Sequence, residues 1–385
     1  IAADPANAYK YTGKGNMVAV ISNGTAILGL GNLGPLASKP VMEGKALLFK
    51  RFAGLDSIDI EVKHRTTEDF INTVANIADT FGGINLEDIK APECFYVEQK
   101  LQEELDIPVF HDDQHGTGIV ALAAFINSLH LTGKKKEKVK LVFSGAGAAG
   151  LACVRILAEY GVPKKNITLV DIDGVVRTDR QDLPEHLAEF AQKTKKETLA
   201  EVIEGADIFF GLSAGGVLKA DMVKKMAKNP VIFAMANPNP EIMPDEVHAV
   251  RNDAIVGTGR SDFPNQVNNV LVFPYVFRGA LDCGATTVNS EMKIAAAEGI
   301  AALARKQADS ALDVAYKGKT LKFGPEYVIP KPFDSRLVSI VAPAVAKAAM
   351  ESGVAKRPID DLEAYATGLK ENVDESFSLM RQIFS

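Results

Sequence analysis

A strand, a glycine-rich turn and a helix follow one another in the middle of the chain, and this order constrains the fold most strongly. The apolar run "KLVFS" leads into "GAGAAG" at 145–150, and the helical stretch "LACVRILAEYG" comes directly after it. Glycines permit a tight turn and let backbone N–H groups approach a pyrophosphate, whose charge the helix N-terminus stabilises. This context predicts a dinucleotide site rather than a turn without a ligand. The loop residues that we expect to bind the cofactor are Gly145, Ala146, Gly147, Ala148, Ala149 and Gly150.

Apolar runs alternate with helical ones after this loop, as in "NITLVDIDG", "ADIFFGLSA", "PVIFAMANPNP" and "DAIVGTGRSD". Near-continuous apolar runs are typical of parallel strands that are covered on both faces. Asp171 ends the strand after the loop, 26 residues beyond Gly145, where an acid can bind ribose hydroxyls. Asn237 follows a later strand, so it is either a turn residue or an amide that faces the nicotinamide. Both residues are candidate cofactor contacts.

The fold class is therefore α/β with two domains, because 385 residues exceed what one ordinary core accommodates. We expect an N-terminal α/β domain over residues 1–130 and a Rossmann-type doubly wound parallel sheet over 131–300. Residues 301–385 read as a C-terminal helical segment. In its last helix the apolar residues form one side, which is either a core-facing stripe or a docking surface. These residues are Leu362, Leu369, Val373, Leu379 and Ile383.

Composition excludes several classes of function. The formal net charge of −6 and the isoelectric point near 5.7 argue against nucleic acid as a partner. No apolar run is long enough to span a membrane. Three distant cysteines are typical of reduced thiols, so we expect a cytoplasmic protein.

A second glycine motif, "GLGNLG" at 29–34, also fits the dinucleotide pattern. Pro35 and Pro40 are expected to interrupt the helix that should follow it, and we see no alternation of strands and helices after it. We therefore interpret this motif as a tight backbone turn and not as a nucleotide loop.

Two acidic pairs are candidates for a metal site. Glu87 and Asp88 follow an apolar run, and Asp112 and Asp113 lie in "FHDDQHGTG". Either pair alone could be a solvated loop, but together they offer oxygen ligands that suit Mg²⁺ or Mn²⁺.

The alternative metal is zinc on His111 and His115. We disfavour it because Gly116 and Gly118 argue against a helix through this stretch. Lys45 is expected between a glycine turn and an apolar strand. Such a lysine is either exposed or, if buried beside a carboxylate, a proton-transfer group whose pKa desolvation lowers.

Five long motifs together resemble malic enzyme, closest to its bacterial small-subunit and hybrid forms. They occur in order along nearly the whole chain and read "GTAILGLGNLG", "GKALLFKRFAG", "FGGINLEDIKAPECF", "VFHDDQHGTG" and "TGRSDFPNQVNNVLVFP". The resemblance implies oxidative decarboxylation of L-malate to pyruvate and CO₂, with NAD(P)⁺ and Mg²⁺ or Mn²⁺. The N-terminal domain would then bind substrate and metal, and a homodimer is expected. In hybrid forms a phosphotransacetylase-like domain follows, so the full-length protein is expected to carry one.

The resemblance also implies roles for individual residues. Lys45 would be the base that takes the malate hydroxyl proton, and Asp112 would polarise it. Asn237 and the Asn268–Asn269 pair would lie around substrate and nicotinamide. The metal ligands would be Glu87, Asp88 and Asp113.

Two departures from the family pattern are visible. The family's acid is a tyrosine in a segment like "YSPGVA", which we expect upstream of Ile1; Tyr9 and Tyr11 do not match that motif. Larger malic enzymes carry an arginine before "LGLG", where this chain has "NGTAILGLG". The residues that bind the substrate carboxylate are therefore expected to differ from those of the larger enzymes.

The choice of cofactor is open from sequence alone. Asp171 and Asp173 favour NAD, because they would repel a 2′-phosphate, whereas Arg177 and Arg180 favour NADP. We predict NADP, with NAD as the alternative. Competing functions are a metal-free amino-acid or hydroxy-acid dehydrogenase and a catalytically inactive nucleotide-sensing module.

Overall fold

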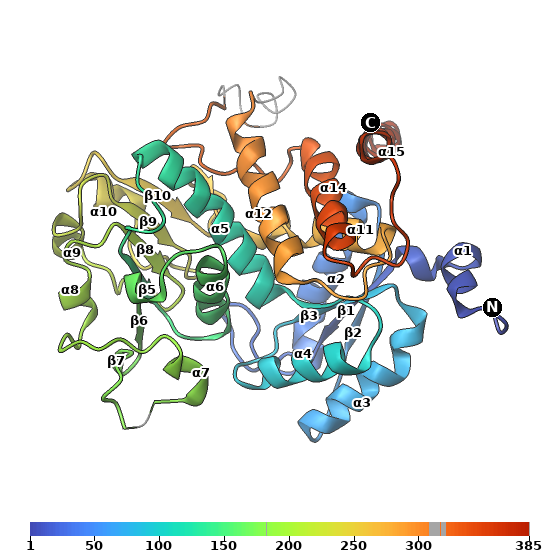
Figure 1. Ribbon diagram of the computed structural model, residues 1–385, viewed down its shortest axis with the longest axis horizontal. Coiled ribbons are helices and arrows are strands. Elements are labelled where there is room, and N and C mark those ends of the chain that lie inside the picture. Colours follow the sequence, from blue (N-terminus) through green and yellow to red (C-terminus); the bar gives the residue numbers. More distant parts are fainter. Residues whose placement is uncertain (182, 308–315, 317–320, 385) are drawn as a thin grey trace. The chain divides into compact units, whose positions relative to one another are not determined.

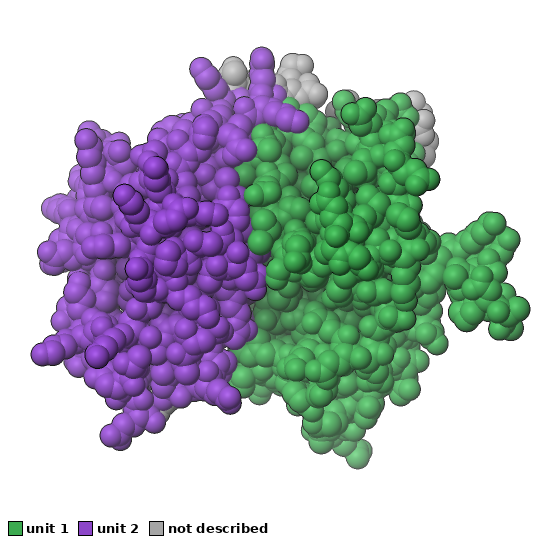
Figure 2. All heavy atoms as spheres, viewed as in Figure 1, with its two compact units in different colours: residues 1–116, 269–303, 332–385 green, residues 117–268, 304–331 purple. Residues whose placement is uncertain are grey.

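The computed structural model describes residues 1–181, 183–307, 316 and 321–384, with side chains through residue 373 (Figure 1). The chain forms two compact units, each built from more than one segment (Figure 2). Unit 1 comprises residues 1–116, 269–303 and 332–385, and unit 2 comprises 117–268 and 304–331. The predicted domain ranges divide the chain differently, at 130 and 300, and they stay predictions.

Unit 1 is built on a four-stranded sheet in which every neighbouring pair is parallel, in the order β2-β1-β3-β4. The central strand β1 reads "MVAVIS" and is buried over most of its length, as expected for a strand covered on both faces. The strands are β1 Met17–Ser22, β2 Asp56–Glu61, β3 Gly83–Glu87 and β4 Val109–His111.

Helices alternate with these strands, so the expectation that no such alternation follows "GLGNLG" was wrong. Helix α2 begins at Pro35, where a missing N–H loses no partner and the fixed φ suits a helix start. Pro40 lies inside α2 without ending it, and Gly54 closes the helix in the left-handed conformation. Unit 1 also contains α1 Ala8–Tyr11, α2 Pro35–Ala53, α3 Thr67–Ile77, α4 Glu93–Glu104, α11 Phe273–Asp282, α14 Arg336–Glu351 and α15 Leu362–Phe384.

Unit 2 is built on a seven-stranded sheet in the order β11-β10-β9-β8-β5-β6-β7. All pairs are parallel except β6 with β7. The order reverses between β5 and β8, which is where open parallel sheets bind ligands. The prediction of an α/β fold with a Rossmann-type parallel sheet is confirmed. The strands are β5 Leu141–Ser144, β6 Ile167–Asp171, β7 Gly174–Val175, β8 Ile208–Gly211, β9 Val231–Ala234, β10 Ile255–Thr258 and β11 Asn265–Gln266.

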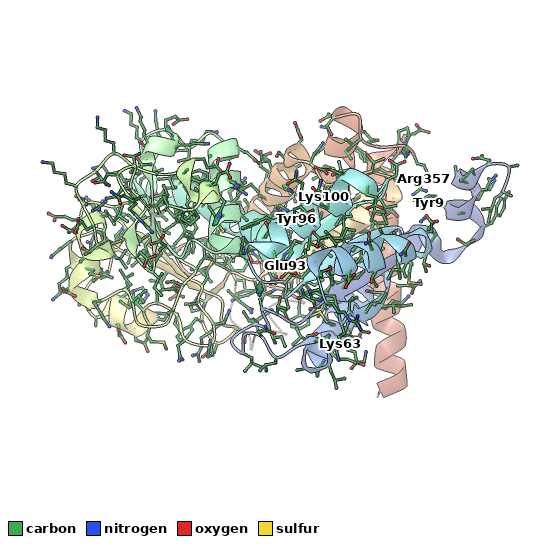
Figure 3. The ribbon with its side chains drawn as sticks, turned by 90° about the horizontal axis from the view of Figure 1, so that it is seen from below. Tyr9, Lys63, Glu93, Tyr96, Lys100 and Arg357 are labelled. Carbon is green, nitrogen blue, oxygen red and sulfur yellow. The ribbon has the colours of Figure 1, made fainter. Side chains whose placement is uncertain are left out.

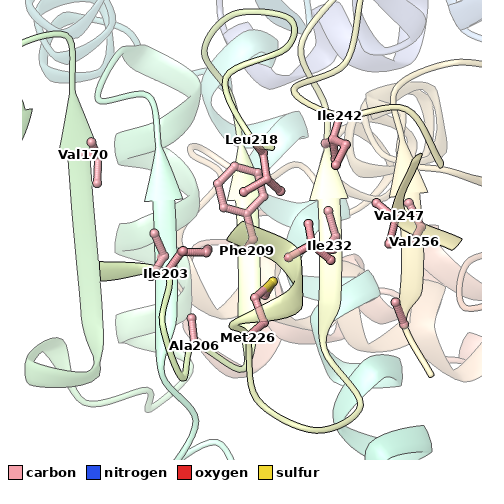
Figure 4. Packing of buried hydrophobic residues seen from close by; sticks show 14 of the residues in the cluster. Val170, Ile203, Ala206, Phe209, Leu218, Met226, Ile232, Ile242, Val247 and Val256 are labelled. Carbon is pink, nitrogen blue, oxygen red and sulfur yellow. The ribbon is translucent and has the colours of Figure 1, made fainter. Parts of the chain in front are cut away.

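One face of the unit 2 sheet packs against short helices through an apolar cluster (Figure 4). Phe209 of β8 and Ile232 of β9 lie in this cluster with Leu218, Met226 and Val247, and all five are buried. The alternate side chains Phe143, Phe210 and Phe233 are also buried, and neighbouring rings contact each other, with 4.7 Å between the centroids of Phe143 and Phe210. The helices of this unit are α6 Ala148–Glu159, α7 Glu185–Ala188, α8 Leu199–Val202, α9 Ala220–Lys224 and α10 Pro244–His248.

Two helices cross the division between the units, α5 Asp112–Thr132 and α12 Ser290–Arg305. In α15, Leu369 and Val373 are buried, which agrees with a core-facing stripe; the side chains of Leu379 and Ile383 lie outside the described residues.

Near the start of the chain, the Arg357 guanidinium lies 4.4 Å from the centre of the Tyr9 ring (Figure 3). All three cysteines are free and buried. Within the described ranges, none of the helices has both the length and the apolar character that crossing a membrane requires.

Candidate active site

Three carboxylates meet at the carboxyl edge of the unit 1 sheet. Glu87 ends β3, Asp88 follows it, and Asp113 lies in the first turn of α5. One oxygen from each lies within 4.8 Å of the others, and no other such group of possible metal ligands occurs among the residues that the structure describes. Asp88 has a φ of 53°, an uncommon value for a residue with a side chain, and its N–H donates to Asp113 Oδ2 at 2.8 Å. The two acidic pairs of the sequence are thus brought together in space.

Keeping the carboxylates of this cluster ionised is energetically unfavourable. Burial, together with the other carboxylates, raises the pKa of Asp88 to about 8 and that of Glu87 to about 7, although Lys45 opposes both shifts. Burial also raises the pKa of Asp113 to about 6. Asp88 Oδ2 is buried without a hydrogen-bond partner. A small divalent cation fits this set of residues, because it supplies the missing partner and balances the crowded negative charge.

Lys45 lies beside this cluster, in helix α2 and not next to a strand as expected. Its Nζ is 2.5 Å from Asp112 Oδ2 and 2.9 Å from Glu87 Oε1, and it sits 4.3 Å from the centre of the Phe273 ring. Burial by itself lowers the pKa of the amine, but Asp112 and Glu87 outweigh burial and the pKa is raised. The expected net lowering is therefore wrong, because the pKa of Lys45 beside these two carboxylates is raised.

Asp112 is fully buried and is held from two sides. Besides Lys45, its Oδ2 accepts a hydrogen bond from Asn269 Nδ2 at 2.5 Å. Burial raises the pKa of Asp112 to about 7. Asn269 therefore belongs to this site, while its predicted companion Asn268 belongs to unit 2.

The glycines of "FHDDQHGTG" lie within a helix, so the expectation that they argue against one was wrong. Helix α5 begins at Asp112 and runs through Gly116 and Gly118. A Cβ at Gly116 would overlap the Asp112 carboxylate and would come within 3.0 Å of Asn269 Cβ. Glycine at 116 thus makes room for the buried acid.

The two histidines of the motif lie outside the carboxylate cluster. His115 Nε2 is 2.9 Å from Glu98 Oε2, and the ring of His111 is fully buried. Burial lowers the pKa of His111 to about 4, so it is neutral at pH 7. A zinc site on this pair receives no support from the described residues, since neither histidine joins a group of three possible ligands.

In unit 2 the predicted strand, turn and helix follow one another as β5, the loop at 145–147 and α6. Gly145 has a φ of 114°, and a Cβ there would overlap the Leu212 carbonyl oxygen. A Cβ at Gly150 would overlap the Gly145 carbonyl oxygen, whereas Gly147 borders open space. The first and third glycines thus allow close packing, and the second leaves the helix N-terminus accessible to a phosphate.

Asp171 ends β6 and is paired with an arginine. Arg180 Nη1 lies 2.9 Å from Asp171 Oδ1 and 2.8 Å from Oδ2, and its Nη2 lies 3.5 Å from Asp173. Arg177 instead pairs with Asp179 and Glu197. The acid that would repel a 2′-phosphate is therefore neutralised by a neighbouring guanidinium.

Asn237 follows β9 and is exposed at the carboxyl edge of the unit 2 sheet. Its Nδ2 donates to the Met235 carbonyl at a long 3.4 Å, and a Cβ at Gly259 would lie 3.0 Å from it. Turn and ligand-binding roles both remain compatible with this position.

Two buried glutamates of these sites were not anticipated. Glu241 accepts hydrogen bonds from the Ser213 and Ala236 backbone N–H groups, joining the ends of β8 and β9. Glu98 accepts hydrogen bonds from residues around the Asp112–Asp113 pair. A signal for Glu98 was available, since it occurs among Cys94, Val97 and Leu101 on an apolar helix face.

Two family descriptions match successive parts of the chain. Residues 6–102 match the family description "Malic enzyme, N-terminal domain", and residues 114–315 match "Malic enzyme, NAD binding domain". The chain is 58% identical over 384 residues to the NADP-dependent malic enzyme of Rhizobium meliloti (strain 1021), covering 100% of this chain and 50% of that protein. A second protein of that organism, named NAD-dependent malic enzyme, is 56% identical, with 99% and 50% covered.

Among solved structures, the malic enzyme from Pyrococcus horikoshii Ot3 superposes with a TM-score of 0.86 at 42% identity, covering 100% of this chain and 89% of that one. The chain spans about half the length of the two curated relatives.

Proposed function

Because this chain belongs to the malic enzyme family, we propose that it oxidises L-malate and decarboxylates the product to pyruvate and CO₂, with NADP⁺ as the preferred oxidant and Mg²⁺ or Mn²⁺ as the metal. The single observation that carries this proposal is the position of Lys45, which lies between Asp112 and Glu87 at the edge of a three-carboxylate cluster. A base beside oxygen ligands is the pairing that deprotonation of a 2-hydroxy acid requires.

In this proposal Glu87, Asp88 and Asp113 hold the divalent cation. When bound, the cation supplies positive charge that polarises the substrate hydroxyl and stabilises the enolate left after loss of CO₂. Lys45 Nζ accepts the hydroxyl proton, and Asp112 and Asn269 fix the direction of the amine. Because the carboxylates keep Lys45 protonated, it becomes a base only when their charge is balanced.

Unit 2 binds the nucleotide in this proposal. The loop at 145–150 and the N-terminus of α6 would hold the pyrophosphate of NADP⁺, and the bound nucleotide would supply the hydride acceptor for oxidation of malate at C2. The Arg180–Asp171 pair favours NADP, because the guanidinium offsets the acid and can bind a 2′-phosphate. Asn237 and Asn268 stay proposed contacts of nicotinamide and substrate.

The test measures formation of reduced nicotinamide by the full-length protein with L-malate and each cofactor, in Mn²⁺ and in EDTA. We expect activity that requires Mn²⁺ and prefers NADP⁺. Lys45→Ala and Asp113→Asn should each abolish turnover, whereas the surface change Asp106→Asn should leave turnover with Mn²⁺ intact. Activity that ignores EDTA would favour the metal-free dehydrogenase, and no activity at all would favour the nucleotide-sensing module.

Further features of the protein rest on the resemblance alone. They are a homodimer, a C-terminal phosphotransacetylase-like domain in the full-length protein and a general-acid tyrosine upstream of Ile1; a cytoplasmic location is proposed separately, from the three distant cysteines. Size measurement of the full-length protein tests the first of these.

A further inference from the structure

Helix α4 carries one acid on its buried face. Cys94, Val97 and Leu101 are completely buried and form an apolar stripe, and Glu98 lies within this stripe at 6% exposure. Tyr96 and Lys100, labelled in Figure 3, are partly exposed on the same helix, so the polar face of α4 is elsewhere. Burying a carboxylate is costly unless it is hydrogen-bonded, which raises the question of what Glu98 binds.

Its partners come from the end of β4 and the start of α5. Glu98 Oε1 accepts the His111 backbone N–H at 2.9 Å, Oε2 accepts the Gln114 side-chain amide at 3.3 Å, and His115 Nε2 lies 2.8 and 2.9 Å from the two oxygens. Burial alone would raise the pKa of Glu98, but contacts with His115 and Lys293 outweigh burial and lower it, so the carboxylate is ionised. These partners stand immediately before and after Asp112 and Asp113 in the sequence.

The direction of the His115 hydrogen bonds is fixed from the other side. Lys293 Nζ, on α12, lies 3.1 Å from His115 Nδ1. An ammonium group only donates, so Nδ1 accepts and the ring proton is on Nε2, where it is donated to Glu98. Hydrogen bonds thus run in one direction, from Lys293 to His115 and from His115 to Glu98.

We propose that Glu98 is the positioning residue of the acidic pair: it anchors the turn on both sides of Asp112 and Asp113, and the Lys293–His115 contact fixes one of its donors. This inference rests on the proposed metal and lysine site, because it assigns Asp113 to the cation and Asp112 to Lys45. Loss of residues that orient metal ligands commonly lowers metal affinity about 10- to 100-fold. Glu98 touches neither cation nor substrate in this role.

The test is the dissociation constant of Mn²⁺, followed by the electron paramagnetic resonance signal of the free ion. Glu98→Leu continues the apolar stripe but removes the acceptor, so we expect the Mn²⁺ dissociation constant to rise at least tenfold. Glu98→Gln keeps an oxygen for His111 and His115, and Gln114 can turn its amide to accept from the new NH₂ group. We therefore expect Glu98→Gln to stay within threefold of the wild type.

The control is Leu101→Ala on the same face of α4. It should lower the midpoint of thermal unfolding, because it leaves a cavity, and leave Mn²⁺ affinity unchanged. Unchanged affinity in Glu98→Leu would overturn the proposal, and so would equal losses in Leu101→Ala or Glu98→Gln. If Glu98→Leu does not fold, His115→Phe retains a ring beside Phe110 and should raise the dissociation constant about threefold or more; no change would overturn the proposal. Because Mn²⁺ binding is measured without malate, failure of the malate assay would be recognised separately.

Discussion

Asp88→Asn is the change that most directly tests the carboxylate cluster, because it removes one of three crowded charges and keeps the shape of the side chain. Asp88 is 2% exposed and Oδ2 has no hydrogen-bond partner. If the cluster exists to hold a cation, the metal-free variant should be more stable than the metal-free wild type. The variant should also lose its response to Mn²⁺.

The magnitude follows from the shifted pKa. Burial and the neighbouring acids raise the pKa of Asp88 from 3.8 to about 8. At pH 7 this shift disfavours the folded state by about 4 kcal/mol, since each pH unit above the unfolded pKa costs about 1.4 kcal/mol. Asparagine avoids this cost but buries an amide, which costs about 1–3 kcal/mol. We therefore expect a net gain of about 2 kcal/mol, or an increase in Tm of about 2–3 °C for a chain of 385 residues.

The direction of the Asp88 pKa shift also predicts how stability depends on pH. The folded-state pKa of Asp88 lies above its unfolded value, so the wild type loses stability as pH rises from 3.8 through about 8. The advantage of the variant should therefore grow over this range in EDTA.

The assay is thermal unfolding in EDTA and in Mn²⁺ at about 100 times its dissociation constant, where a bound ligand stabilises by about 2.7 kcal/mol. The wild type should gain this stability, and the variant should not. Asp106→Asn is the matched control, since this aspartate is 85% exposed and pairs with Lys356 at the surface; it should change stability by less than about 1 kcal/mol. The reasoning is refuted if Asp88→Asn is less stable than the wild type in EDTA, or if Mn²⁺ stabilises both proteins equally.

Three further changes test other parts of the site. Arg180→Gln should lower the ratio of kcat/KM for NADP⁺ to that for NAD⁺ about 10- to 100-fold, because Asp171 then faces the 2′-phosphate without a neutralising charge; an unchanged ratio would contradict this role. Gly150→Ala should weaken NADPH binding in a fluorescence titration at least about tenfold, since the new methyl group displaces the loop carbonyl at Gly145; wild-type affinity would argue against this loop as the phosphate site. Gly116→Ala should lower kcat at least about tenfold, because the methyl group pushes the Asp112 carboxylate away from Lys45; normal kcat would show that this contact is dispensable.

Local sequence patterns predicted much of the fold. The glycine loop at 145–150 stands between an apolar strand and an uninterrupted helix, and all the information needed to place it lies within about twenty residues. The acids at 87–88 and 112–113 were also recognisable as two pairs of oxygen ligands, although the parallel sheet that brings them to one edge was not predicted.

What the sequence could not reveal depends on contacts between distant residues. Gly116 resembles a helix breaker until the Asp112 carboxylate is seen against it. Pro35 resembles an interruption, but at the first position of α2 it starts the helix. Lys45 and Asp112 are 67 residues apart, and only tertiary packing makes them a pair. The direction of the Lys45 pKa shift could not be inferred from burial alone, because two carboxylates reverse it.

The charges of the site explain why base and cation should act together. Glu87, Asp88, Asp112 and Asp113 carry four negative charges when ionised, and Lys45 supplies one positive charge, which leaves a net −3 before protons are taken up. Burial raises the pKa values of the acids and the neighbouring negative charges add to this shift, while the carboxylates around Lys45 outweigh its burial and raise the pKa of the amine. A divalent cation reduces the imbalance to −1 and thereby weakens the attraction that holds the lysine proton. In the proposed mechanism, the cluster that would bind the metal also holds the lysine proton, so the action of Lys45 as a base would be coupled to metal occupancy through electrostatics.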